Sequence, residues 1–217
     1  MSFAVNALGA LNVARATATV RAGVVFFSTD YVFGGRDRER GHPYEEGDGL
    51  HPLNVYGVSK GAGEQLVMQA NPRHLVVRSA GLYGTATSRK GWTFPELMLN
   101  KARTEGIVRV VTDQVLSPTF TADLALKTRE LIEQDAVGLF HLTNAGECSW
   151  FEFARGVFDL AGVDVKMEPI RTDQTQRRAR RPSYSALTTT RLAEVGLSRL
   201  RPWKEALGYY LRAKGLS

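Results

Sequence analysis

Three side chains in the first part of the chain have the types and spacing of an acid–base site. Tyr56 and Lys60 lie four residues apart, so a helix that begins at Tyr56 stacks the phenol and the ammonium on one face. A free phenol titrates at about 10, and a nearby cation favours the phenolate by about 1 to 3 pKa units. We therefore expect Lys60 to lower the pKa of Tyr56 and to make it a general acid/base. The hydroxyl of Thr29 is expected to bond the same substrate oxygen.

The elements that must position these groups form a strand–helix–strand pattern. The apolar run at Val24 to Ser28 predicts a buried strand that delivers Thr29 to its carboxyl end, and a helix is expected from Tyr56 to Ala70. His74 to Arg78 predicts a second buried, parallel strand. Open α/β folds bind ligands at the carboxyl ends of such strands. The sequence therefore predicts an α/β fold with its site at this edge.

Further segments complete the predicted pattern. The helix that carries Asp123 in its first turn is expected to be capped by Thr121. Other helices are predicted at Ser2–Arg21, Trp92–Glu105, Trp150–Leu160, Thr190–Val195 and Pro202–Ala213, and other strands at Ile107–Val111, Gly138–Leu142 and near Val165–Ile170.

Two blocks of sequence occur in a fixed order, Ser28-Thr29-Asp30-Tyr31-Val32-Phe33 and Tyr56-Gly57-Val58-Ser59-Lys60-Gly61-Ala62-Gly63-Glu64-Gln65. Together they resemble the extended short-chain dehydrogenase/reductases, and within these the dTDP-4-dehydrorhamnose reductase family. The runs Asp113–Leu124 and Arg181–Leu187 also match the family pattern, so the resemblance covers nearly the whole chain. A lone Tyr/Lys pair recurs by chance, whereas the ordered blocks are more specific.

The resemblance implies a partial Rossmann-type parallel sheet with a small α/β substrate-binding lobe. It also implies transfer of hydride from NADP(H) or NAD(H) to C4 of dTDP-4-dehydrorhamnose, in dTDP-rhamnose biosynthesis. Tyr56 is expected to donate the proton, Lys60 to hold the nicotinamide ribose, and Thr29 to bind the keto oxygen. The implied site contains catalytic Thr29, Tyr56 and Lys60, cofactor-binding Ser28, Tyr56, Lys60, Ser79 and Ala80, and substrate-binding Thr29, Asp30, Gly81 and Arg181.

Two departures from the family pattern keep other functions open. Gly81 stands where an aromatic residue that touches the sugar is usual, and Leu116 stands where Gly is usual. A nucleotide-sugar epimerase or dehydratase shares the hydroxyl, Tyr and Lys set, although a dehydratase is expected to need an acidic pair beside the hydroxyl. The other alternative is a non-catalytic subunit that binds sugar nucleotides or regulates a partner.

A glycine-rich phosphate-binding turn of the Rossmann type is not found before Ser28. We therefore expect a chain that lacks the family's N-terminal cofactor-binding part, with weak cofactor binding and uncertain activity. Residues 1–90 are interpreted as a remnant of the NAD(P)-binding domain, and residues 91–217 as mainly a substrate-binding lobe with segments that return to the Rossmann core. The strand at Val24 to Ser28 is then expected to be an apolar edge, which makes a homodimer plausible.

Composition narrows the class of protein. The chain has 217 residues, a formal net charge of +6 and a single Cys148; the lone cysteine excludes an internal disulfide, is consistent with the cytoplasm, and gives no support for a metal site. No signal peptide or membrane span is expected. A basic cluster is either a solvated loop or a clamp for a substrate diphosphate, and nucleic-acid binding is disfavoured because aromatic residues are not interleaved with it. The cluster contains Arg171, Arg177, Arg178, Arg180 and Arg181.

Overall fold

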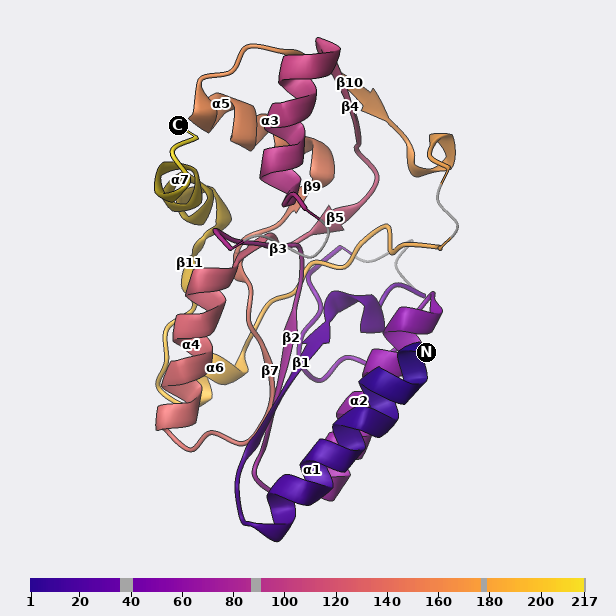
Figure 1. Cartoon of the computed structure of the whole chain (residues 1–217), viewed down its shortest axis with the longest axis vertical. Coiled ribbons are helices and arrows are strands. Elements are labelled where there is room, and N and C mark those ends of the chain that lie inside the picture. Colours follow the sequence, from indigo (N-terminus) through magenta and orange to yellow (C-terminus); the bar gives the residue numbers. More distant parts are fainter. Residues whose placement is uncertain (36–40, 87–90, 177–178, 217) are drawn as a thin grey trace.

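The computed structural model describes residues 1–35, 41–86, 91–176 and 179–216. Figure 1 shows two parts, a lower part built on a parallel sheet and an upper part built mainly of helices. The predicted Arg177 and Arg178 of the basic cluster lie outside the described residues.

The central sheet has three parallel strands in the order β1-β2-β7. They are β1 (Val24–Thr29), β2 (His74–Ser79) and β7 (Gly138–His141). Thr29 pairs with Ser79 in register, so the carboxyl ends of β1 and β2 lie side by side. These ends face the upper part of the molecule (Figure 1). The predicted parallel α/β fold is therefore confirmed.

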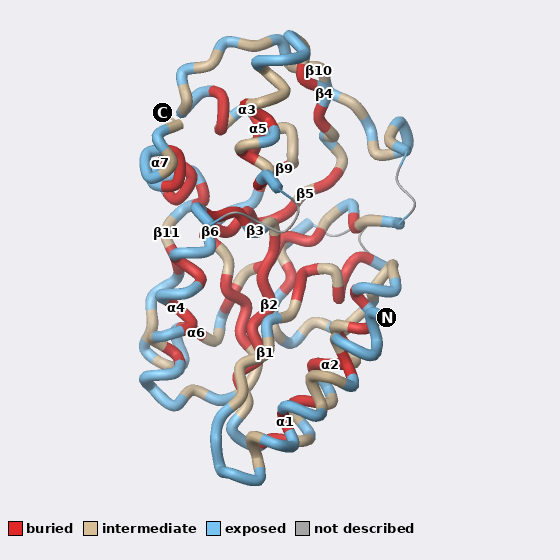
Figure 2. Tube along the Cα trace, viewed as in Figure 1, coloured by how far each residue is buried: buried red, intermediate tan, exposed pale blue. Residues whose placement is uncertain are grey.

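Helices cover both faces of this sheet (Figure 1). On one side lie the π-helical turn η1 (Ala4–Gly9), α1 (Ala10–Thr19) and α2 (Val55–Ala70). On the other side lie α4 (Thr121–Glu133) and the short α6 (Arg191–Glu194). Apolar residues of α4 join those of β2 and β7 in one buried cluster, and Figure 2 shows that β2 runs through the buried interior.

The upper part has its own core, made largely of aromatic rings. Tyr83, Phe153 and Tyr210 are each at most 1% exposed, and Tyr83 packs edge-on against Tyr210 at 5.1 Å between ring centroids. Its helices are α3 (Phe94–Glu105), α5 (Trp150–Ala161) and α7 (Trp203–Ala213), with β4 (Ile107–Val111) paired to β10 (Lys166–Ile170).

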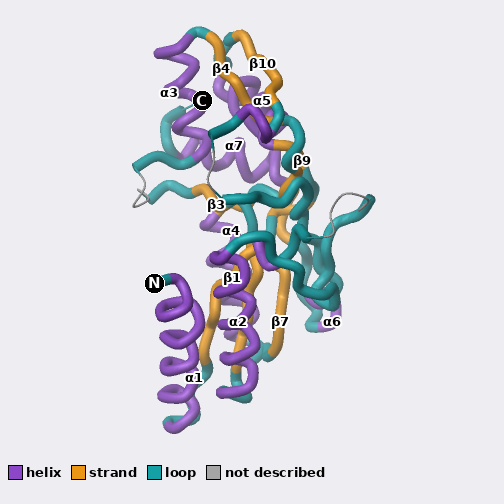
Figure 3. Tube along the Cα trace, turned by 90° about the vertical axis from the view of Figure 1, so that its right-hand side faces the viewer, coloured by secondary structure: helices purple, strands orange, loops and turns teal. Residues whose placement is uncertain are grey.

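Short elements connect the two parts, and Figure 3 shows loops gathered between them. The short strand pairs are β3 (Leu82–Tyr83) with β6 (Thr119–Phe120), β5 (Val115–Leu116) with β9 (Cys148–Ser149), and β8 (Asn144–Ala145) with β11 (Leu200–Pro202). Two 3-10 turns, η2 (Asp30–Val32) and η4 (Thr172–Gln174), complete the described elements.

Most predicted elements are confirmed to within a few residues, but the predicted helix cap is wrong. The residue before α4 is Phe120, and no side chain caps the helix there. Asp123 does lie in the first turn of α4, where Arg201 binds it with contacts of 2.6 and 2.9 Å. In the described part of the chain β1 pairs only with β2, which confirms the expected edge strand, and Phe27 on it is 48% exposed.

Candidate active site

The hydroxyl of Thr29 lies at the carboxyl end of β1, where the extended strand changes into η2. Thr29 Oγ1 accepts a hydrogen bond from the Tyr31 backbone N–H at 3.2 Å and donates one to Asp30 Oδ1 at 2.9 Å. The side chain is 7% exposed. Local backbone geometry therefore holds the hydroxyl at the sheet edge, as the sequence predicted.

The start of α2 brings a phenol to this hydroxyl. Asn54 caps the helix by accepting a hydrogen bond from the Gly57 backbone N–H at 2.9 Å. A Cβ atom on Gly57 would lie 2.0 Å from the Tyr31 carbonyl oxygen, so only glycine allows the first turn of α2 to pack directly on η2. This close approach places Tyr56 beside Thr29. The hydrogen bond between the Thr29 hydroxyl and the Tyr56 phenol acts to lower the pKa of the phenol.

The predicted lowering of the Tyr56 pKa is wrong for this structure. Burial raises the pKa of Tyr56 and the nearby charge of Asp30 adds to the rise, while the hydrogen bond with Thr29 opposes it. Lys60 does not contribute to this shift, because its Nζ donates to the Phe27 carbonyl and lies 4.1 Å from the centre of the Phe26 ring. The helical spacing puts Lys60 on the face of α2 that meets β1, and the strand backbone holds its charge there.

Asp30 is a buried carboxyl group within the site. It is 5% exposed, and burial raises its pKa to about 6 against the hydrogen bonds from Ser185 and Thr29. Ser185 Oγ donates to Asp30 Oδ2 at 2.6 Å from a segment 155 residues away in sequence. Asp30 therefore joins the end of β1 to the carboxyl-terminal part of the chain.

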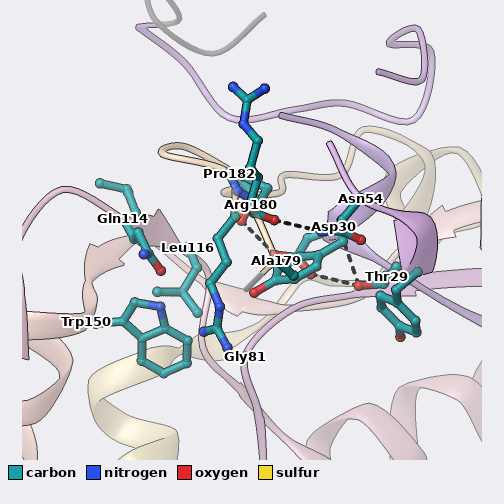
Figure 4. A pocket seen from close by; sticks show the side chains of 15 residues that line it. Thr29, Asp30, Asn54, Gly81, Gln114, Leu116, Trp150, Ala179, Arg180 and Pro182 are labelled. Carbon is teal, nitrogen blue, oxygen red and sulfur yellow. Dashed lines mark hydrogen bonds between the residues drawn. The ribbon is translucent and has the colours of Figure 1, made fainter. Parts of the chain in front are cut away.

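A cavity of about 470 Å³ opens beside these groups. Figure 4 shows Thr29, Asp30 and Asn54 on one side of it, opposite Gln114, Leu116 and Trp150. The segment from Ala179 to Pro182 lies between the two sides, and Asn54 Nδ2 donates to the Arg180 carbonyl at 3.0 Å. A second cavity of about 600 Å³ in the upper part shares a border with the first. The shared lining residues are Gln114, Trp150 and Arg181.

The side chain of Leu116 packs against Gly81 in the cavity wall. Gly81 has a φ of +53°, and a Cβ atom there would lie 2.6 Å from Leu116 Cδ1 and 3.2 Å from Pro118 Cα. A side chain at position 81 therefore needs a smaller residue at position 116. Leu116 therefore fills space that a side chain at position 81 would need.

The remaining predicted residues lie in different environments. Ser28 donates its hydroxyl to Glu64, away from the cavity lining. Ser79 is buried, and its Oγ has no hydrogen-bond partner among the described residues. Ala80 packs into the apolar cluster of Phe33 and its neighbours. Arg181 lines both cavities. The structure thus brings together Thr29, Asp30, Tyr56, Gly81 and Arg181, with Lys60, Ser28, Ser79 and Ala80 close by in sequence but outside the cavity lining.

A buried ionic network supports the strand ends from the α2 side. Arg78 on β2 forms a bidentate pair with Glu64 on α2, at 3.0 and 2.7 Å, and the two side chains are 3% and 0% exposed. His141 on β7 continues the network, with Nε2 3.3 Å from Arg78 Nη1. His141 Nδ1 lies 2.9 Å from the Thr188 carbonyl, so Nδ1 carries the proton and Nε2 accepts from Arg78. Burial and the charge of Arg78 lower the pKa of His141 to about 4.

Sequence reasoning missed several polar and aromatic residues of the cavity. Among them are Asn54, Gln114, Trp150 and Ser185, of which Gln114 and Ser185 lie in segments that match the family pattern. For Asn54 a local signal exists, since Asn is a preferred residue immediately before a helix. Trp150 follows Ser149, which forms a capping box with Glu152 at the start of α5. Gln114 carries no comparable local signal.

Among the described residues, no three His, Cys, Asp or Glu side chains gather in a way that would hold a metal ion. Cys148 is buried, and burial raises the pKa of its thiol. None of the helices in the described part of the chain has the length and apolar character needed to span a bilayer.

A parallel sheet with helices on both faces, and a hydroxyl, a phenol and a carboxyl group beside a cavity at its carboxyl edge, define an α/β protein of the Rossmann-like class. Residues 1–215 match the family model described as the RmlD substrate binding domain. The chain belongs to this family.

Individual relatives agree with the family assignment. The chain is 43% identical over 206 residues to a dTDP-4-dehydrorhamnose reductase of Mycolicibacterium smegmatis, covering 94% of this chain and 62% of the relative. A solved dTDP-4-dehydrorhamnose reductase of Clostridium acetobutylicum has a TM-score of 0.90 at 40% identity, covering 97% of this chain and 72% of that one. A Bacillus anthracis dTDP-4-dehydrorhamnose reductase in complex with NADP has a TM-score of 0.89 at 38% identity, covering 96% and 72%. This chain therefore spans about three fifths to three quarters of the length of these relatives.

Proposed function

We propose that this chain carries the proton-transfer and substrate-binding machinery of an NAD(P)H-dependent reductase of a dTDP-linked 4-ketosugar, with dTDP-4-dehydrorhamnose as substrate and dTDP-rhamnose as product. The observation that carries the proposal is the meeting of the Thr29 hydroxyl and the Tyr56 phenol beside a cavity at the carboxyl ends of parallel strands. Two polar groups that converge on one point of such an edge suit a carbonyl oxygen on which charge develops.

The residues at the end of β2 fit a nicotinamide cofactor. Ser79 lies in register with Thr29, and its buried Oγ lacks a hydrogen-bond partner among the described residues. A buried hydroxyl without a partner costs free energy, so a polar group of a ligand beside Ser79 would remove that cost. Ser79, Ala80, Lys60 and the backbone of Ser28 would hold the cofactor. When bound, the cofactor, NADPH or NADH, supplies the hydride for C4 of the sugar.

The protein's own groups act on the ketone oxygen and the rest of the substrate. Tyr56 gives its proton to that oxygen as C4 is reduced, and Thr29 fixes the oxygen beside the phenol. Lys60, on the same helix, would bind the ribose of the cofactor. The cationic Arg181 borders both cavities, where a forked donor suits a diphosphate.

Cofactor binding and substrate binding are assigned to different parts of the fold. We assign the cofactor side to residues 1–90 and the substrate side mainly to residues 91–217, with later segments returning to the core of the lower part. Support comes from β7 in the central sheet and from α4 on its face. A homodimer and a cytoplasmic location stay predictions.

The proposal is tested with the full chain, purified NADPH and dTDP-4-dehydrorhamnose, following loss of NADPH absorbance and formation of dTDP-rhamnose. Tyr56→Phe should lower kcat by at least about a hundredfold. Tyr209→Phe is the matched control, because Tyr209 on α7 is similarly exposed, at 48% against 46% for Tyr56, and lies outside both cavities. Wild-type turnover by Tyr56→Phe would refute the assigned role.

Two alternatives are separated by further observations. Asp30 is the single carboxyl group among the described residues that line the first cavity, so the acidic pair expected of a dehydratase is not found in that lining. A non-catalytic binding subunit predicts binding of the dTDP-sugar without binding of NADPH. Calorimetric titration of the full chain with each ligand distinguishes this outcome from the reductase.

A further inference from the structure

A continuous row of polar groups leads from the phenol into the interior of the site. Tyr56 faces Thr29, Thr29 donates to Asp30 Oδ1 at 2.9 Å, and Asp30 Oδ2 accepts from Ser185 at 2.6 Å. Thr29, Asp30 and Ser185 are 7%, 5% and 4% exposed. Figure 4 shows Thr29 and Asp30 adjacent to each other in the cavity wall. Asp30 is thus a buried acid one hydroxyl away from the phenol.

The hydrogen bonds of Thr29 leave one of its lone pairs available to a neighbouring oxygen. A threonine hydroxyl has one proton and two lone pairs. The Thr29 proton points to the Asp30 carboxylate, and one Thr29 lone pair accepts from the Tyr31 backbone N–H. The other lone pair is left for a proton from a neighbouring oxygen. Such a hydroxyl can pass a proton in either direction without leaving its place.

Tyr56 needs a proton source in the proposed reaction. Each reduction leaves the phenol as a phenolate, since its proton has gone to the sugar oxygen. The second polar group one helical turn away, Lys60, is bound to the Phe27 carbonyl and does not line the cavity. Thr29 and Asp30 do line it, together with Tyr56.

We propose that Asp30 returns the proton to Tyr56 through the Thr29 hydroxyl after each turnover, an inference that rests on the proposed reductase function. Protonated Asp30 gives its proton to Thr29 Oγ1, and the Thr29 hydroxyl proton moves to the Tyr56 oxygen. One O–H bond breaks and one forms at Thr29, the phenol is restored, and Asp30 is left as a carboxylate. Asp30 then takes up, through the open cavity, the one solvent proton that each reduction by NADPH consumes, so no other reactant is required.

The pKa values of Asp30 and Tyr56 agree with proton transfer from Asp30 to Tyr56. Burial raises the pKa of Asp30 to about 6, and burial raises the pKa of Tyr56 above its ordinary value of 10.0. The proton therefore moves from the stronger acid to the weaker one. The loss of the hydrogen bond from Ser185 would raise the pKa of Asp30, because that bond stabilises the carboxylate.

Other charged and titratable groups face the same space and are part of the test. Tyr56 lies on α2, Tyr31 lies on η2, and Arg180 and Arg181 lie on the segment that ends at Ser185. Because the two arginines remain in all variants, a change that follows Asp30 or Ser185 alone is assigned to the row and not to the cationic segment.

The first experiment needs no turnover. The phenolate absorbance of Tyr56 is titrated in the full chain and in Asp30→Asn, with Tyr56→Phe subtracted to remove the other tyrosines. The carboxylate opposes ionisation of Tyr56, so Asp30→Asn should lower the pKa of Tyr56. An unchanged Tyr56 titration would overturn the relay even if the chain is an active reductase, and a lowered one supports it even if turnover is absent.

The second experiment follows kcat against pH. If Asp30 reprotonates Tyr56, the wild-type pH profile has a limb in which kcat falls as pH rises above about 6. This limb should disappear in Asp30→Asn. Below that pH, kcat of this variant should be lowered at least about tenfold, with KM within about twofold of the wild-type value. Ser185→Ala should move the limb to higher pH. Thr29→Ser should keep the limb, whereas Thr29→Val should remove it. A limb that stays at the same pH in Asp30→Asn or Ser185→Ala refutes the relay, whereas loss of activity in wild type and variants alike refutes the reductase assignment instead.

Discussion

Replacing Glu64 with Gln removes one charge from a pair that water does not reach. Glu64 is fully buried and Arg78 is 3% exposed, and two hydrogen bonds of 3.0 and 2.7 Å join them. Gln keeps the shape of the side chain but leaves the Arg78 guanidinium without its counter-charge. Breaking a buried pair by neutralising one partner costs about 3–5 kcal/mol. The free energy of unfolding of Glu64→Gln should fall by this amount.

The other contacts of Arg78 do not offset the loss of the Glu64 charge. Arg78 also lies 3.3 Å from His141 Nε2 and 5.0 Å from the Phe33 ring, and neither contact replaces a carboxylate. At about 2–4 °C per kcal/mol for a chain of this size, the melting temperature should fall by about 6–20 °C. Urea denaturation followed by circular dichroism measures the free-energy change directly.

A double variant separates the charge from the packing. Glu64→Gln combined with Arg78→Met removes both charges, so much of the lost stability should return. The matched control is Arg109→Met, because Arg109 pairs with Glu168 at 3.0 Å on the surface, where it is 64% exposed, and such pairs contribute about 0–1 kcal/mol. A cost below about 1 kcal/mol for Glu64→Gln would refute the reasoning.

Three further variants test other parts of the structure. Gly57→Ala places a Cβ atom 2.0 Å from a carbonyl oxygen, and should destabilise the protein by about 1–3 kcal/mol in urea denaturation, whereas Gly47→Ala, with nothing within 4 Å of its added Cβ, should change stability by less than about 0.5 kcal/mol. Leu116→Ala should raise the dissociation constant of the dTDP-sugar about tenfold by calorimetry, because it removes apolar cavity wall; an unchanged constant argues against contact with substrate. His141 is neutral in the fold with a pKa of about 4 but titrates at about 6.5 when unfolded, so its contribution to stability falls as pH drops through that window by up to about 1.4 kcal/mol per pH unit. The stability difference between wild type and His141→Gln should shift in that window and be constant above pH 7.

The order of elements and the position of the site were predictable because they depend on local sequence. An apolar run that ends in a hydroxyl, followed by a helix with a phenol in its first turn, places both groups at one sheet edge whatever the rest of the chain does. Thr29 and Tyr56 do lie there.

Other properties of the site depend on contacts between distant segments and were not predictable. Spacing correctly placed Lys60 one turn from Tyr56, but the charge of Lys60 is held by the Phe27 carbonyl on the neighbouring strand, so the predicted shift in the pKa of Tyr56 has the wrong sign. The bond between Ser185 and Asp30 joins residues 155 positions apart. The contact between Leu116 and the space beside Gly81 also needs coordinates, because periodicity does not bring a turn residue and a strand residue into contact.

The segment from Ala179 to Ser185 links binding in the cavity to the acidity of the site. It lines the cavity at Arg180, and its backbone is held by Asn54 at the start of α2. At its end Ser185 bonds Asp30, whose burial is the largest cause of its raised pKa. The same segment therefore limits the space for a substrate and supplies a hydrogen bond to the carboxyl group. A change that alters its path should affect ligand affinity and the proton affinity of Asp30 together, because one piece of backbone sets both.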